Sequence, residues 1–251
     1  MERKTIPESE QRLTILYTLR VLEAVTEGQL LQFMVELDLM NYFTLQPALI
    51  EMEERGQLRR RSHPCGSLLC LSEAGAHTLA EFEQRIPASK RSLIDDRGSV
   101  WLRRFRLEQQ TPAEAVHLPD GRDCLRLRLL EGDSSLLDIM LTLPEGEKIR
   151  CLAEKWHRSA ERVLQAVVAA LMMEPVAADT LPENTALQPV GDADWLLTLN
   201  GGTAEEPMVL LMPLKDEALA RSAAVHWPEQ AEPLRQLILQ ALREEIMPGQ
   251  G

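Results

Sequence analysis

The segment 38–79 constrains the fold more than any other part of the chain, because several independent signals in it agree. A short helix over 44–55 is expected to end at Gly56, since glycine adopts the left-handed conformation that terminates many helices. A basic strand, a Pro-Cys-Gly turn and a second strand follow, and Ser72 then caps a new helix. The two strands are expected over 57–62 and 67–71.

Two further helices are expected upstream of this segment. The first runs from about 9 to 24, where leucines recur at helical spacing. Thr26 followed by Gln29 forms a capping box that would begin the second helix. Pro47 is tolerated in a first turn, so the third helix is expected to begin near Thr44. This order predicts a winged helix-turn-helix domain, whose third helix can enter the major groove of DNA.

Polar and basic side chains in this domain are candidates for contact with double-stranded DNA. Asn41, Thr44 and Gln46 can exchange hydrogen bonds with base edges. Tyr42 could contact sugar or phosphate, and the arginines on the wing can contact phosphates. Because side chains alternate along a strand, Arg59 and Arg61 share one face and Arg60 takes the other. The candidate DNA-contacting residues are Asn41, Tyr42, Thr44, Gln46, Arg59, Arg60 and Arg61.

The same segment supports an interpretation without DNA. The third helix ends with the acidic residues Glu51, Glu53 and Glu54, which would repel phosphate. Tyr42 and Phe43 could belong to the core, and the arginines could form a solvated strand. The domain would then serve as a docking surface for another protein.

The charge of the chain argues against general binding to polyanions. The net charge is −12, and 45% of the residues are hydrophobic, as in an ordinary globular protein. Residues 1–98 hold 12 basic and 15 acidic side chains, whereas residues 99–251 hold 15 and 24. Any basic face for DNA is therefore expected in the N-terminal part.

The sequence favours a cytoplasmic protein that does not enter a membrane. Residues 1–10 are polar and lack the apolar core of a signal peptide. The best candidate for a membrane segment, 166–173, is far shorter than the roughly 20 residues that a spanning helix needs. The four cysteines show no disulfide framework, which suits reduced thiols.

No catalytic or metal-binding set can be assembled from the sequence. The spacings of His63, Cys65, Cys70 and His77 match no compact zinc pattern. Trp156 lies on an apolar helical stripe, where a tryptophan usually belongs to the core. We therefore expect no enzyme activity, no metal and no cofactor.

Beyond the first domain, the hydrophobic period changes from helical to alternating. Residues 88–98 are polar and are expected to form a short helix and a linker, and 101–108 are expected to form a strand. Apolar residues alternate over 125–129 and again over 137–143, which predicts two strands joined by a turn. A long amphipathic helix is expected from about 145 to 173.

The last part of the chain, 175–251, is similar to the unit before it. A shift of 71 residues without a gap places Trp156 on Trp227 and Ile139 on Leu210. A strand–strand–helix unit has only a small sheet, so pairing with a second copy would bury more apolar surface.

The second copy is expected to differ from the first in two places. Pro228 and Pro233 should break its helix into two pieces, because proline lacks an amide hydrogen. The segment 209–212 is apolar on both faces, as in a more buried strand.

Several motifs resemble an uncharacterised bacterial family known as DUF4364, over roughly residues 10–172. They are Met40-Asn41-Tyr42-Phe43, Leu45-Gln46, Leu49, Gly56, the LSEAG segment 71–75, Ile86-Pro87 and Lys155-Trp156. The resemblance implies a winged-helix domain followed by a small α/β domain, and a role in transcriptional regulation. It supplies no catalytic residues. This chain extends beyond the usual end of the family by the segment that carries the repeat.

Together these observations predict an α+β protein of three parts. Residues 1–98 would form the winged helix-turn-helix domain, 99–174 a small α/β unit, and 175–251 a second, repeat-like unit. We expect a DNA-binding transcriptional regulator whose C-terminal part serves assembly or effector sensing. The alternative is a non-catalytic protein-interaction module. The chain could form a homodimer, or its two α/β copies could pair internally as a pseudo-dimer.

Overall fold

The computed structural model describes residues 7–143, 148–173, 176, 180–191 and 194–244, and it has the mixed α+β class expected from the sequence. The chain divides into two compact units, 1–107 and 108–251, each with its own hydrophobic core. The boundary expected at residue 98 falls inside a helix.

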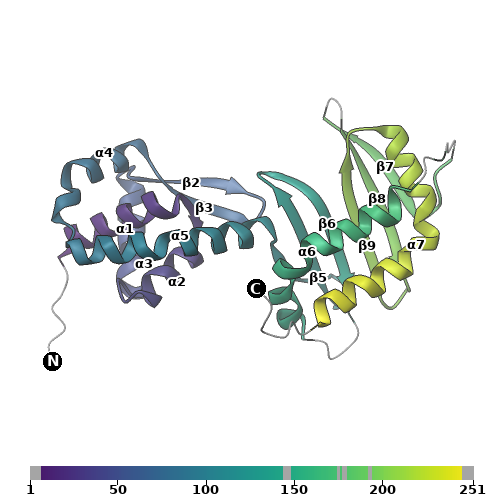
Figure 1. The fold of residues 1–251 in the computed structure, drawn as a ribbon, viewed down its shortest axis with the longest axis horizontal. Helices are drawn as coiled ribbons and strands as arrows, with labels where there is room; N and C mark the ends of the chain where they lie inside the picture. The colour runs from purple at the N-terminus through teal and green to yellow at the C-terminus, as the bar shows by residue number, and fades with distance from the viewer. Residues whose placement is uncertain (1–6, 144–147, 174–175, 177–179, 192–193, 245–251) are drawn as a thin grey trace. The chain divides into compact units, whose positions relative to one another are not determined.

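The first unit combines helices with a small antiparallel sheet of strand order β1-β3-β2 (Figure 1). Its helices are α1 (Glu8–Leu22), α2 (Glu27–Glu36), α3 (Tyr42–Glu54), α4 (Glu73–Phe82) and α5 (Ala88–Gln110), with a 3-10 turn η1 (Glu83–Arg85). Its strands are β1 (Ala24–Thr26), β2 (Leu58–His63) and β3 (Gly66–Leu71). The expected hairpin is present, while β1 was not anticipated.

Side-chain caps fix the starts of three helices in the first unit. The capping box of Thr26 and Gln29 is confirmed, and Ser72 caps α4. The expected start of α3 near Thr44 is wrong, because Asn41 caps the helix and accepts a hydrogen bond from the Thr44 amide at 3.0 Å. Pro47 therefore lies inside α3. Because Pro47 has no amide hydrogen, the Phe43 carbonyl lacks the hydrogen bond that it would otherwise accept within the helix. This carbonyl lies near the exposed start of α3, where water can bind it.

The strand expected over 101–108 is also wrong, because this segment is the second half of α5. Trp101 and Phe105 lie one helical turn apart, and both are buried against the first unit's core. The Trp101 ring meets Phe33 of α2 edge-on, with 5.7 Å between centroids. Packing against this core therefore keeps 101–108 helical, although the sequence alone predicts a strand there.

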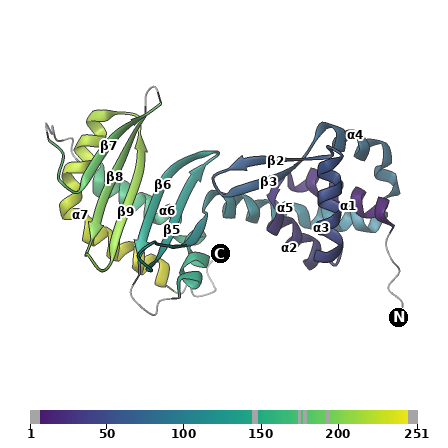
Figure 2. The ribbon, with the colours of Figure 1, turned by 180° about the vertical axis from the view of Figure 1, so that it is seen from behind.

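The second unit is a six-stranded antiparallel sheet of order β4-β5-β6-β9-β8-β7, with α6 and α7 on one face (Figures 1 and 2). Its strands are β4 (Ala113–His117), β5 (Asp123–Glu131), β6 (Ser134–Thr142), β7 (Thr185–Val190), β8 (Asp194–Gly202) and β9 (Pro207–Leu214). Its helices are α6 (Ile149–Leu171) and α7 (Glu217–Arg243).

The two halves of this sheet correspond in position and in pairing. Both bounds of β8 lie 71 residues after those of β5. The central pair β6–β9 places Ile139 opposite Leu210, and these two residues are themselves 71 positions apart. Both halves also hold a buried tryptophan: Trp156 Nε1 donates to the Arg128 carbonyl at 2.8 Å, and Trp227 Nε1 donates to the Asn200 carbonyl at 2.7 Å.

The expectation that Pro228 and Pro233 break the last helix into two pieces is wrong. The helix α7 is continuous through both prolines, although its ribbon bends in Figure 1. Trp227, Leu234 and Ile238 are buried against the sheet, so packing along one face offsets the lost backbone hydrogen bonds. None of the helices in the described part of the chain combines the length and hydropathy that a membrane crossing requires.

Candidate nucleic-acid and protein-docking surface

The first two residues predicted to read bases are bonded to each other. Asn41 Oδ1 accepts hydrogen bonds from the Thr44 amide and from Thr44 Oγ1, both at 3.0 Å. These bonds belong to the cap that starts α3. Reading a base with either group through these atoms would therefore disturb the start of the helix.

The third predicted base reader, Gln46, and the predicted phosphate contact Arg60 are held by carboxylates of the same unit. Gln46 Nε2 donates to Glu27 Oε1 at 2.5 Å, and Arg60 donates to the other Glu27 oxygen at 3.0 Å. Arg60 Nε also lies 2.5 Å from a Glu53 oxygen. The bonds from Gln46 and then Arg60 lower the pKa of Glu27, and the contacts with Glu53 and Glu27 raise the pKa of Arg60.

This network ties α2, α3 and β2 together. Its carboxylates place negative charge beside the helix that was predicted to approach phosphate. The sequence does not predict this network, because Glu27 is distant in the chain from both Gln46 and Arg60.

The other two candidate arginines of β2 remain available. Arg59 pairs with Cys70 and Arg61 with Leu68 in the β2–β3 register, so both lie on the face opposite Arg60, as predicted. Both side chains are exposed, and neither takes part in an ion pair or side-chain hydrogen bond within the described residues. Two unpaired cations on one strand face can attract an anionic partner.

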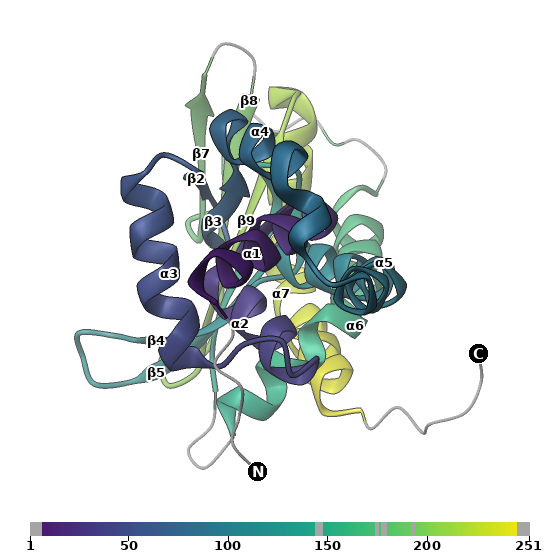
Figure 3. The ribbon, with the colours of Figure 1, turned by 90° about the vertical axis from the view of Figure 1, so that its left-hand side faces the viewer.

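The solvent face of α3 is apolar rather than polar. Phe43 is 83% exposed and Ile50 is 57% exposed, and the exposed Pro47 lies between them at helical spacing. We call Phe43, Pro47 and Ile50 the apolar strip. Tyr42, which is 51% exposed, packs its ring edge-on against Phe43 with 5.7 Å between centroids. In Figure 3, α1 separates α3 from α5, and the strip belongs to a helix at the edge of the unit.

The opposite face of α3 carries the buried residues Leu45, Leu49 and Met52. The helix is therefore apolar on two sides, and only one side has a partner within the unit. The sequence contained this signal, since positions 43, 47 and 50 are apolar and out of phase with the core positions.

The first unit as a whole carries no net charge. With the observed boundary, residues 1–107 hold 15 basic and 15 acidic side chains, so the net charge of −12 belongs to residues 108–251. Arg12 and Arg55 both bind Glu51, at 3.0 and 2.5 Å. Glu54 is exposed at the last turn of α3 and has no ion pair within the described residues.

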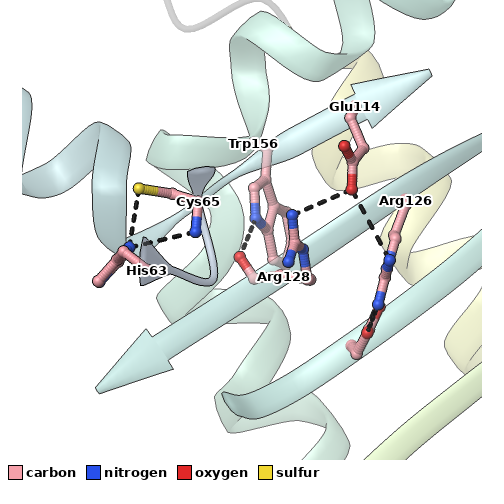
Figure 4. Close-up of polar contacts among 7 residues, drawn as sticks. His63, Cys65, Glu114, Arg126, Arg128 and Trp156 are labelled. Carbon is pink, nitrogen blue, oxygen red and sulfur yellow. Dashed lines mark hydrogen bonds and ion pairs between the residues drawn. The ribbon is translucent and has the colours of Figure 1, made fainter. Parts of the chain in front are cut away.

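Figure 4 shows two further polar groups, one in each unit. At the tip of the β2–β3 hairpin, His63 Nδ1 lies 2.8 Å from Cys65 Sγ and accepts a hydrogen bond from the Cys65 amide at 3.1 Å. In the second unit, Glu114 binds Arg128 at 3.0 Å and lies 3.8 Å from Arg126. The described residues contain no cluster of three or more His, Cys, Asp or Glu side chains that could hold a metal ion.

Most of the chain matches a known protein family. A family model described as a domain of unknown function, DUF4364, matches residues 11–171. The chain belongs to the DUF4364 family. The match confirms the resemblance seen in the sequence. It begins within α1 and ends at the last residue of α6, so the DUF4364 region does not include β7 to α7. No curated protein matches the chain, and no solved structure matches it.

Proposed function

We propose that this DUF4364 protein is a non-catalytic, cytoplasmic regulatory adaptor whose first unit is a winged helix that docks another protein. One observation carries the proposal: the solvent face of α3 is apolar, while Asn41, Thr44 and Gln46 are bonded within the unit. A helix that reads bases needs polar side chains free to reach them. Exposed apolar side chains grouped on one face are instead typical of protein contacts.

The chemistry of the surface specifies the partner. A complementary segment buries apolar side chains against Phe43, Pro47 and Ile50. It also presents a basic side chain to Glu54, which adds to the negative pole at the end of the α3 dipole. The partner is therefore an amphipathic protein segment with a cationic flank.

We also infer that the second unit arose by duplication of an α/β unit and forms an internal pseudo-dimer. The constant offset of β5 and β8, the pairing of Ile139 with Leu210, and the matching bonds of Trp156 and Trp227 support this. In a twofold interface a residue that lies on the axis faces its own equivalent. In the pair β6–β9, Ile139 faces its equivalent Leu210 in this way. A fused pseudo-dimer carries one winged helix, whereas dimeric helix-turn-helix readers present two.

A second function, DNA binding, is favoured by one observation. Arg59 and Arg61 are exposed on one face of β2 and lack partners among the described residues. In this alternative the wing holds the phosphates, and affinity falls steeply as salt rises. With only two such arginines the contact is weak and has little sequence preference.

Site-specific photo-crosslinking in cells tests the docking proposal. A benzophenone amino acid placed at Phe43 is expected to give covalent products with protein. The same residue placed at Val100, which is 67% exposed on α5, is the matched control and should not give those products. Products with DNA at position 43, or identical protein products at both positions, would contradict docking through the apolar strip.

A further inference from the structure

A groove of about 250 Å³ lies on the first unit between α1, the end of α3 and α4. Buried leucines, Leu13 and Leu16, form its base together with Phe82. An apolar base with a few polar groups around it is the usual composition of a small-molecule site. All of its lining residues belong to one unit, so the groove is complete within that unit.

Three arginines line this groove: Arg12, Arg55 and Arg85. Arg12 and Arg55 share the carboxylate of Glu51. Arg85 lies over the Phe82 ring, with its guanidinium carbon 4.7 Å from the centroid, and no ion pair within the described residues includes it. The groove therefore offers a cation next to an aromatic surface, which suits a negatively charged group on an apolar ligand.

An unsatisfied acceptor lines the same groove. Gln57 Oε1 is buried and has no hydrogen-bond partner within the described part of the chain, while its Nε2 lies 3.5 Å from Thr78 Oγ1. The Gln57 backbone is fixed, because its amide donates to the Met52 carbonyl at 2.9 Å and its carbonyl accepts from Ser72 at 3.2 Å. A buried acceptor without a donor is costly, so a ligand that supplies one is favoured.

We propose that this groove binds a small carboxylate with an apolar body and one hydrogen-bond donor. The carboxylate pairs with Arg85, the apolar body covers Leu13, Leu16 and Phe82, and the donor reaches Gln57 Oε1. Because Gln57 joins the end of α3 to the start of β2, such a ligand stabilises the junction between the docking helix and the wing. This site does not depend on whether α3 docks a protein.

Titration calorimetry and thermal unfolding of the full chain test the site with three related probes. We expect 4-hydroxyphenylacetate to bind more tightly than phenylacetate, which lacks the donor. Phenylacetamide, which lacks the charge, is expected to bind about tenfold more weakly than phenylacetate. Each ligand that binds raises the melting temperature by an amount that grows with the logarithm of its concentration relative to its Kd.

Variants then assign the contacts. Arg85→Gln is expected to weaken 4-hydroxyphenylacetate about tenfold, whereas Arg97→Gln, which removes an exposed charge from α5, leaves its affinity unchanged. Gln57→Met is expected to abolish the preference for the hydroxyl while phenylacetate still binds. The proposal is overturned if no probe binds at millimolar concentration, if the amide binds as well as the acids, or if Arg85→Gln binds like the unmodified chain.

Discussion

Trp156→Ala and Trp227→Ala are each expected to lower the free energy of unfolding of the second unit by about 3–5 kcal/mol. Trp156 is 0% exposed and Trp227 is 1% exposed, so either change opens a large cavity beneath the sheet. Each change also removes the donor to a strand carbonyl, Arg128 or Asn200. Because the two residues occupy equivalent positions, the two losses should be similar.

Urea unfolding followed by far-UV circular dichroism measures both losses. Val190→Ala, at an exposed position of β7, is the control and should stay within about 0.5 kcal/mol of the unmodified chain. Trp227→Phe keeps most of the ring volume but lacks the donor, so it should cost much less than Trp227→Ala. A large loss for one tryptophan and none for the other would argue against equivalent halves.

A chain that ends after residue 173 is expected to be a dimer, whereas the full chain is expected to be a monomer. The truncation removes β7 to α7 and leaves β6 with an unpaired edge. It also uncovers residues of α6, such as Val163 and Val167, that share one core with α7. An exposed strand edge beside apolar surface pairs readily with another chain. Two truncated chains can restore the twofold arrangement by placing Ile139 opposite its own copy.

Light scattering coupled to size exclusion gives the mass of both proteins, and circular dichroism establishes that the truncated chain is folded. The full chain should elute with a mass near 28.3 kDa, and the truncated chain should elute at twice its own mass. A folded, monomeric truncated chain would remove the support for an internal pseudo-dimer. So would a full chain that dimerises through the same strand.

Local signals allowed most of the first unit to be predicted. The caps at Thr26 and Ser72 depend on residues within one helical turn, and both were placed correctly. The cap of α3 cannot be placed in this way, because Pro47 by itself favours a first turn, whereas the packing of Leu45 and Leu49 holds the helix through it. Packing likewise kept α7 continuous through its two prolines. Such tertiary contributions cannot be obtained from local propensity.

The candidate site was predictable only in part. Alternation along β2 correctly separated Arg59 and Arg61 from Arg60. The engagement of Gln46 by Glu27 was not predictable, because it joins two helices whose packing is set by the core. The exposure of Phe43 and Ile50 was missed for a similar reason: a helix that is apolar on two faces does not reveal which face is buried.

Selection of bound duplexes from a random DNA pool tests most directly whether α3 docks protein rather than reads DNA. If α3 docks protein, we expect no enriched sequence motif. Any binding should be weak and salt-sensitive, and it should be reduced by Arg59→Gln with Arg61→Gln and unchanged by Phe43→Asp. An enriched motif whose binding is lost in Asn41→Ala or Gln46→Ala would contradict docking through α3, because α3 would then read bases with side chains that the structure shows bonded within the unit.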